Sequence, residues 1–249
     1  MNSSNSSIPS RSYWHVVARQ LRQEPVAMAS AVVLLLIICA AVFAPWLAPA
    51  DPFKASMLKR LLPIGSPSYW LGTDELGRDM VTRLMYGGRL SLLMGVVPVF
   101  AAFFIGTSIG LFAGYVGGRV NMVIMRVLDV FYAFPSVLLA VAISGALGPG
   151  MSNSLLALTL VFVPQVVRVA ESVTTQVRKL DYIEAARMSG ASSFSIIRVH
   201  VLGNVLGPVF VYATGLLSVS MILASGLSFL GLGVKPPEPE WGLMLNTLR

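Results

Sequence analysis

The stretch LSLLMGVVPVFAAFFIGTSIGLFAGYVGG, residues 90–118, contains no Asp, Glu, Lys or Arg. A helix needs about 20 mostly apolar residues to cross the hydrocarbon core of a bilayer, so this run is long enough to span a membrane. Three further blocks also lack charged residues: 25–50, 130–167 and 199–234. The block 130–167 contains SGALGPGMSNS, whose Gly, Ser, Pro and Asn residues are typical of a turn, so it should fold back as two spans. The sequence therefore predicts five membrane helices, at about 26–46, 91–116, 122–146, 154–172 and 204–231.

The composition agrees with a chain that folds in lipid. Of its 249 residues, 55% are hydrophobic and only 12% are charged, whereas a soluble domain carries about 25% charged residues. Backbone groups in lipid must be satisfied internally, which leaves helices or a closed β-barrel. A barrel would show short alternating segments, and these apolar runs are continuous. The expected fold class is an all-α integral membrane bundle with about five spans.

The remaining composition excludes several functions. The net charge of +7 is attributed to Lys and Arg that flank membrane spans, so no nucleic-acid partner is expected. The single cysteine, Cys39, lies inside an apolar run, and His15 and His200 have no ligand spacing. We therefore predict no metal site, and no arrangement of residues indicates a catalytic centre.

The first apolar block has two interpretations. A basic lead, an apolar core and an A-P-A sequence at 48–50 are typical of a cleaved signal peptide. The lead is long and rich in Ser and Asn, which favours a retained first helix. Its Arg residues then indicate a cytoplasmic N-terminus, although Lys and Arg are nearly balanced between the two sides. The expected organisation comprises a lead (1–25), a first span (26–46), an external loop with a short amphipathic helix (47–89), a core (90–232) with a cytoplasmic loop (173–203), and an external end (233–249).

Several spans contain residues with more than one interpretation. Gly106, Gly110 and Gly114, the glycine ridge, should let another helix approach closely. Each of four prolines removes a helix hydrogen bond and can kink a span: Pro98, Pro135, Pro164 and Pro208. Both features fit a mobile bundle and also ordinary membrane-helix composition.

Two charged pairs lie near span ends. Arg126 and Asp129 are three residues apart, as are Arg168 and Glu171, which places each pair on one helix face. Ionisable residues at membrane depth can mark a transport path. Snorkelling or pairing at the interface is the interpretation favoured by their position near span ends.

The segment DYIEAARMSGASSFSIIRVH, residues 181–200, is the most charged part of the second half of the chain. Asp181 is suited to cap a helix with Glu184 as its capping-box partner, and Gly190 should end that helix in a left-handed conformation. Ser192 or Ser193 can cap a second, amphipathic helix. A rigid helix–hinge–helix between two spans indicates a docking surface for a partner.

EAARMSGA (184–191) resembles the EAA motif of bacterial ATP-binding-cassette importer permeases. The resemblance implies that this loop is a coupling helix that lies in a cleft of the ATPase subunit. The residues that would couple to the ATPase are Asp181, Glu184, Ala185, Ala186, Arg187, Gly190 and Ala191. One position departs from the family pattern, because Gly203 stands where the family usually has proline.

Two further stretches resemble the C-type permeases of the oligopeptide/dipeptide importers. LGTDELGRDMVTRLMYGGRLSLL (71–93) matches their signature before the second span, and LSFLGLGVKPPEPEWG (227–242) matches the stretch after the fifth. The signature-loop residues are Gly72, Thr73, Asp74, Gly77, Arg78 and Asp79. Thr73 or Asp74 can cap the expected amphipathic helix, which either contacts a partner or lies on the bundle. The family normally has a sixth span, before which this chain ends.

The sequence contains no phosphate-binding loop, because Gly precedes none of the four lysines. The resemblance therefore implies that ATP and Mg²⁺ bind in two partner ATPase subunits and that this chain is no enzyme. It also implies a second, homologous permease subunit and a periplasmic or lipid-anchored solute-binding protein. Relatives carry dipeptides, oligopeptides, glutathione, nickel chelates and sugars, and the sequence does not identify the solute or the cavity-lining residues.

Two alternative functions compete with an importer permease in the bacterial inner membrane. A self-sufficient secondary transporter or channel would show intramembrane acids or internal repeats with broken helices. Such a transporter would also leave the segment 181–200 without a function. A membrane assembly protein without transport is the other alternative, which the missing sixth span leaves open. Partner-dependent ATP turnover separates the importer from both alternatives.

Overall fold

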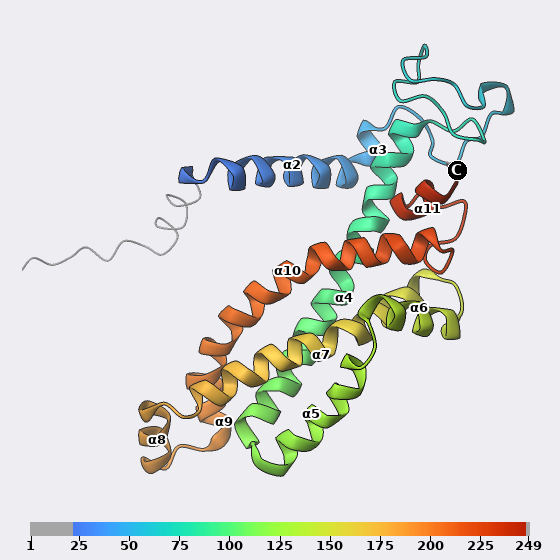
Figure 1. Ribbon diagram of the computed structural model, residues 1–249. Coiled ribbons are helices and arrows are strands. Elements are labelled where there is room, and N and C mark those ends of the chain that lie inside the picture. The colour runs from blue at the N-terminus through green and yellow to red at the C-terminus, as the bar shows by residue number, and fades with distance from the viewer. Residues whose placement is uncertain (1–21, 248–249) are drawn as a thin grey trace, which may run out of the picture.

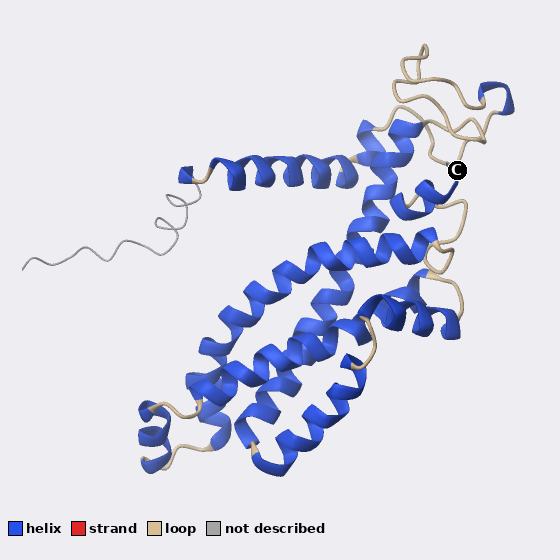
Figure 2. Cartoon of the chain, in the orientation of Figure 1, coloured by secondary structure: helices blue, strands red, loops and turns tan. Residues whose placement is uncertain are grey.

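The computed structural model describes residues 22–247, and Figure 2 shows that their regular structure is helical. The elements in order are α2 (Pro25–Val42), α3 (Ala44–Leu47), a 3₁₀ turn η1 (Met57–Lys59), α4 (Met80–Val116), α5 (Gly118–Tyr132), α6 (Ser136–Leu147), α7 (Met151–Val177), α8 (Asp181–Met188), α9 (Ser193–Ile196), a π-helical turn η2 (Ile197–Val201), α10 (Leu202–Phe229) and α11 (Trp241–Thr247). The expected all-α fold is confirmed. Figure 1 shows α4, α7 and α10 as the long helices of one bundle.

Four segments of the described chain are long and apolar enough to cross a membrane: α2, α4, α7 and the continuous run Ser193–Phe229. The pair α5 and α6 qualifies as a fifth span only if the two are counted together, because they are bent by 86°. The prediction of one helix over 122–146 is therefore wrong. Pro135 lies at the break in an extended conformation, with ψ 131°, and its ring removes the N–H that a continuous helix would use.

The core is built on the close approach of α4 and α7, which cross in Figure 1. A Cβ added at Gly110 would lie 2.6 Å from the Cβ of Ala170 and 2.6 Å from the carbonyl oxygen of Val167. The other two glycines of the ridge meet Val166 and Thr174 at similar distances. The predicted role of the glycine ridge is confirmed, because only glycine leaves room for α7 here.

Helix α2 projects away from the bundle in Figure 1, and nearly all of its apolar side chains are exposed. Its end is held by Arg89 of α4, whose guanidinium donates to the carbonyl oxygens of Ala41 and Val42, both at 2.7 Å. The lead 1–25, including Arg11 and Arg19, lies almost wholly outside the described residues.

Two expected local structures are wrong at their boundaries. The amphipathic helix expected within the loop 47–89 is the first part of α4, which begins at Met80 with Asp79, not Thr73 or Asp74, as its N-cap. The second helix of the segment 181–200 is not separate from the span expected at 204–231 but continues through η2 into α10. In both cases apolar packing extends the helix, since tertiary burial outweighs local stop signals.

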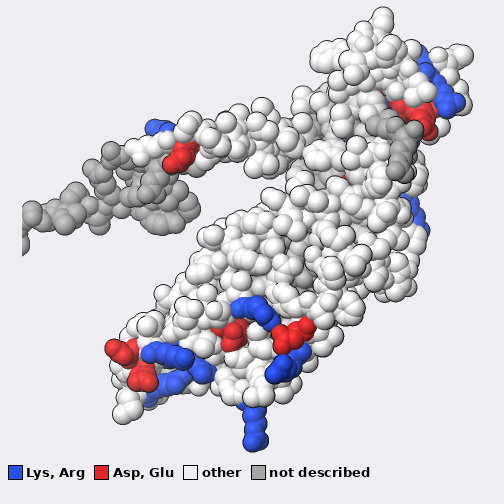
Figure 3. Space-filling view, in the orientation of Figure 1, with Lys and Arg blue, Asp and Glu red and all other residues white. Residues whose placement is uncertain are grey.

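The polar parts of the molecule lie at two ends. In Figure 1 the loop between α3 and α4 stands at one end of the bundle, and α8 and α9 stand at the other. Figure 3 shows acidic and basic side chains over both ends, with a largely uncharged surface between them. This distribution fits a protein that crosses a bilayer, with the loop and α8 on opposite sides.

Candidate functional site

The segment 181–200 forms a short helix, a tight hinge and a second helix. Helix α8 ends in a Schellman motif, in which the Gly190 N–H donates to the Arg187 carbonyl at 3.0 Å and the Ala191 N–H donates to the Ala186 carbonyl at 3.1 Å. Gly190 has φ +81°, so the predicted left-handed conformation is confirmed. Ser192 caps the next helix by accepting the Ser195 N–H at 3.3 Å, which confirms the predicted cap.

The predicted capping box at the start of α8 is not formed. Leu180 occupies the N-cap position, and Asp181 is the first helical residue without a side-chain cap hydrogen bond. Asp181 and Glu184 nevertheless lie in the first turn, where acidic side chains interact favourably with the helix dipole. Both carboxylates remain exposed and available to a partner.

One face of this segment is anchored, and the other is exposed. Ile183 and Ile196 are fully buried against the bundle. Glu184, Ala185, Arg187 and Gly190 are exposed, Ala186 and Ala191 are half-buried, and Met188 is 90% exposed. A rigid element that presents charges and an exposed methionine fits the docking surface expected from the sequence.

Three side-chain contacts join α8 to the ends of the long helices. The Arg187 guanidinium lies 5.4 Å from the centre of the Tyr115 ring, at the end of α4. Asn204 of α10 donates to the Tyr182 hydroxyl at 3.2 Å, and the Tyr182 ring lies beside His200. A displacement of α8 would therefore be transmitted directly to α4 and α10.

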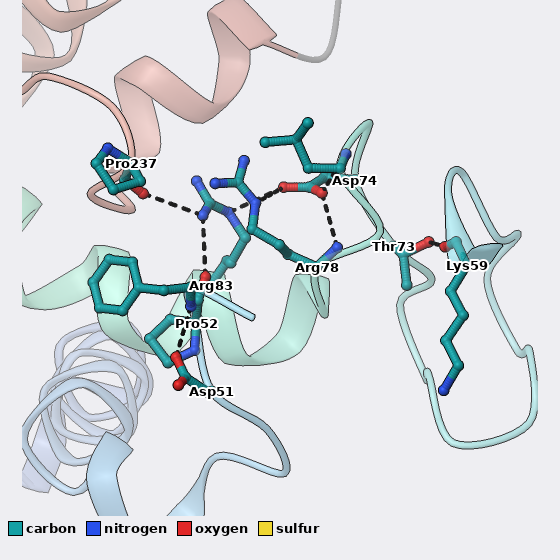
Figure 4. Close-up of polar contacts among 10 residues, drawn as sticks. Asp51, Pro52, Lys59, Thr73, Asp74, Arg78, Arg83 and Pro237 are labelled. Atoms are coloured by element: carbon teal, nitrogen blue, oxygen red, sulfur yellow. Dashed lines mark hydrogen bonds and ion pairs between the residues drawn. The ribbon is translucent and has the colours of Figure 1, made fainter. Parts of the chain in front are cut away.

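The signature loop 71–79 folds around Asp74 at the opposite end of the molecule (Figure 4). One Asp74 carboxylate oxygen accepts backbone N–H groups from Leu76 and Arg78, both at 2.9 Å. The other accepts Nε of Arg78 at 2.7 Å and lies 3.4 Å from Nε of Arg83. All three charged side chains are buried, so their mutual pairing offsets the loss of hydration.

The other signature residues fix the backbone of this loop. Thr73 accepts the Leu62 N–H at 2.9 Å and donates to the Lys59 carbonyl, a contact drawn in Figure 4. Gly72 and Gly77 have φ near +70°, and a Cβ at either would overlap a backbone carbonyl oxygen, that of Leu62 or of Ser56. These positions therefore require glycine for both conformation and space.

Asp79 caps α4. One of its carboxylate oxygens accepts two hydrogen bonds from Thr82, from the backbone N–H at 2.7 Å and from the side-chain hydroxyl at 2.6 Å. Four residues later, Arg83 donates to the carbonyl oxygens of Pro52 and Pro237 at 3.3 and 3.4 Å (Figure 4). The signature loop is thus tied to the segment after α10. These contacts fix the loop on the start of α4.

The stretch 227–242 packs on α4 through Glu240 and Trp241. Glu240 is fully buried and accepts the Ser91 hydroxyl at 2.9 Å and the N–H groups of Gly242 and Leu243 at 3.0 and 2.8 Å. The Trp241 indole N–H donates to the Leu84 carbonyl at 3.0 Å. The ring lies against Gly87 and Gly88 of α4. Two consecutive glycines inside a helix are unusual, and they were the only feature of the sequence that could have indicated this contact.

The charged pairs of the spans bridge two helices. Arg168 of α7 donates to Asp129 of α5 at 2.7 Å, while Arg126 lies 3.8 Å from the same carboxylate. Glu171 accepts Asn121 at 2.5 Å across the same two helices. Sequence spacing predicted pairs within each helix, and Arg168–Glu171 is not formed because each side chain finds a partner on α5.

A cavity of about 190 Å³ adjoins these charges at the break between α5 and α6. Tyr132 and Gln165 line this cavity, together with Ser136, the first residue of α6. Across residues 22–247 no group of three or more His, Cys, Asp or Glu side chains is placed to hold a metal ion. The geometry therefore offers a docking surface at one end and a polar face within the spans.

The chain matches a known family over most of its length. Residues 106–248 match the family described as the binding-protein-dependent transport system inner membrane component, and residues 12–63 match the N-terminal TM domain of oligopeptide transport permease C. The first match covers more than half of the chain. The chain belongs to this permease family. It is accordingly a multi-pass protein of the bacterial inner membrane.

Three curated relatives of this permease show how far the likeness extends. The probable D,D-dipeptide transport system permease protein DdpC of Escherichia coli is 39% identical over 90% of this chain and 75% of its own length. The glutathione transport system permease protein GsiD of Pectobacterium atrosepticum is 40% identical over 96% of this chain and 79% of its own. The di/tripeptide transport system permease protein DppC of Pseudomonas aeruginosa is 41% identical over 97% of this chain and 80% of its own.

Proposed function

We propose that this permease carries peptide-class solutes across the inner membrane and that residues 181–200 couple it to a partner ATPase. The observation that carries the proposal is the exposed, rigid α8 with its Schellman hinge, in a chain of this permease family. The names of its relatives, which include a di/tripeptide and a glutathione permease, support the solute class.

The mechanism follows from the contacts of α8. ATP and Mg²⁺ bind in the two partner ATPases, and their closure moves the docked α8. Because Arg187 contacts the end of α4 and Tyr182 contacts the start of α10, this movement reaches the long helices. A rigid-body change of this kind turns a cavity from one side of the membrane to the other. This chain performs no covalent chemistry, and a second permease subunit and a solute-binding protein complete the complex.

The test is ATP hydrolysis by the complex after co-expression with its neighbouring permease and ATPases. Gly190→Ala places a side chain at φ +81°, at a cost of about 1–2 kcal/mol, and should reduce solute-stimulated hydrolysis. Gly231→Ala is the matched control, since Gly231 has φ +78°, ends α10 in the same Schellman motif and also has no atom within 4 Å of an added Cβ.

A charge reversal provides an independent readout. Glu184→Lys should weaken ATPase binding, while Glu75→Lys, which reverses an exposed carboxylate in the signature loop at the other end, should not. Equal effects of both glycine variants, or of both charge reversals, would contradict the coupling role of residues 181–200. ATPases that never bind the wild-type complex would contradict the importer function.

A further inference from the structure

The ion pair between Asp129 and Arg168 lies beside the break between α5 and α6 and within the length of α7. Asp129 is eleven residues after the start of α5, or roughly 16 Å along the axis, and three residues before the end of α5 at the break. Arg168 is nine residues before the end of α7, or roughly 14 Å. Helix α7 has 27 residues and is about 40 Å long, so a hydrocarbon core of about 30 Å centred on it would contain Arg168 and its partner Asp129.

The pair is nevertheless open to the outside of the chain. The side chains of Asp129 and Arg168 are 46% and 47% exposed. Charged side chains at this depth do not face lipid but face a water-filled cavity or a partner. A face of α5 and α7 that carries such charges therefore suits an inner wall of the assembled transporter.

A row of polar side chains continues from the ion pair along this wall. The Arg168 guanidinium lies 4.4 Å from the centre of the Tyr132 ring, and Tyr132 lines the cavity at the break between α5 and α6. Gln165, one turn before Arg168 on α7, lines the same cavity and accepts the Tyr212 hydroxyl of α10 at 3.3 Å. The wall thus offers an anion, a cation and three polar groups beside a concave surface.

We propose that this wall, defined by Asp129, Tyr132, Gln165, Arg168 and Tyr212, is a transient binding site for the charged termini of a zwitterionic solute. The Arg168 guanidinium binds the solute carboxylate, and the Asp129 carboxylate binds its ammonium group. The inference rests on the proposed transport function and adds the residues that recognise the solute within the membrane.

The ion pair suits such a site because Asp129 and Arg168 neutralise each other's charge when no solute is bound. A half-exposed pair contributes little to stability, so a solute can separate it at small cost. The solute then replaces each lost contact with one of the same kind, because its carboxylate and ammonium are charge-assisted partners. Binding remains weak, as passage through a transporter requires.

The test is uptake into proteoliposomes that hold the full complex, with solute-binding protein outside and ATP inside. The probes are Ala-Ala, Ala-Ala amide and N-acetyl-Ala-Ala, each at a concentration that saturates the binding protein. For Arg168→Gln we expect uptake of Ala-Ala to fall about tenfold, the size of one lost charged hydrogen bond. Uptake of the amide, which lacks the carboxylate, should hardly change.

Asp129→Asn should show the reverse selectivity, with a loss for Ala-Ala and little change for the N-acetylated peptide, which lacks the ammonium group. Arg168→Lys keeps the charge and should restore part of the uptake. Arg119→Gln is the control, because it removes an exposed charge from the first turn of α5, away from the cavity lining. ATP hydrolysis should stay within about twofold of wild type in all variants.

Three outcomes would overturn the proposal. If the variants transport all three probes as wild type does, the wall does not recognise the solute. An equal loss for free and blocked peptides would show that the ion pair only positions α5 and α7. Loss of the second permease subunit on purification would show that the charges serve the subunit interface. A wild-type complex that transports none of the probes would instead contradict the proposed function on which the site rests.

Discussion

Replacing Gly110 with alanine tests the close approach of α4 and α7. The added Cβ would lie 2.6 Å from the Cβ of Ala170, 2.6 Å from the carbonyl oxygen of Val167 and 2.9 Å from the backbone nitrogen of Glu171. Two of these three atoms belong to the backbone of α7 and cannot rotate away. The helix must therefore shift as a body, which disturbs the packing along the rest of the ridge.

The expected magnitude follows from two opposing terms. Overpacking costs about 1–3 kcal/mol, and three contacts this short place the cost near the upper end. Replacing a helical glycine with alanine stabilises the helix by about 1 kcal/mol. The net loss of unfolding free energy is about 1–2 kcal/mol. At about 2–4 °C per kcal/mol for a chain of this length, the midpoint of thermal unfolding should fall by about 2–8 °C.

Gly215→Ala supplies the control, since Gly215 also lies within a long helix but an added Cβ there meets no atom within 4 Å. The Gly215→Ala variant gains helix propensity without any overpacking, so its unfolding midpoint should stay the same or rise. The assay is fluorescence-detected thermal unfolding of both variants in the same detergent. Equal midpoints for the two variants would refute the close packing of α4 on α7.

Three further substitutions test the end of the molecule that carries the signature loop. Asp74→Asn leaves two buried arginines without their anion and should cost about 3–5 kcal/mol of folding free energy, whereas Glu75→Gln at the exposed neighbour should cost nothing measurable by thermal unfolding. Glu240→Gln replaces one of the two buried oxygens that together accept three hydrogen bonds with an NH₂ group, which cannot accept, and should destabilise by about 1–3 kcal/mol, with exposed Glu238→Gln as the silent control. Trp241→Phe removes one hydrogen bond to α4 and should cost about 1 kcal/mol, and no shift in its unfolding midpoint would contradict that contact.

Sequence reasoning succeeded where the signal is local and strong. The charge-free blocks predicted the spans α2, α4, α7 and α10, because a long apolar run in lipid must be helical. The Gly190 hinge and the Ser192 cap were also predicted, since each depends on a single residue and its nearest neighbours. The glycine ridge belongs to the same class, because its spacing alone defines a flat helix face.

It failed where distant segments decide the outcome. The prolines of four spans look alike in the sequence, yet Pro98, Pro164 and Pro208 lie inside continuous helices and only Pro135 lies at a break. Likewise, the three-residue spacing suggested that Arg168 pairs with Glu171 of its own helix, whereas in the structure Arg168 pairs with Asp129 of α5. Neither result follows from local propensity, because each depends on what the neighbouring helix offers.

Cross-linking tests most directly whether residues 181–200 meet the ATPase. Cys39 is the only cysteine, so a Cys39→Ala background allows one cysteine to be placed at will. Met188, 90% exposed on α8, and Met57, 68% exposed in the loop between α3 and α4, mark the two ends of the molecule. With a thiol–amine cross-linker in the assembled complex, Met188→Cys should capture an ATPase subunit and Met57→Cys should not. Capture of the ATPase at position 57, or at neither position, would contradict the account.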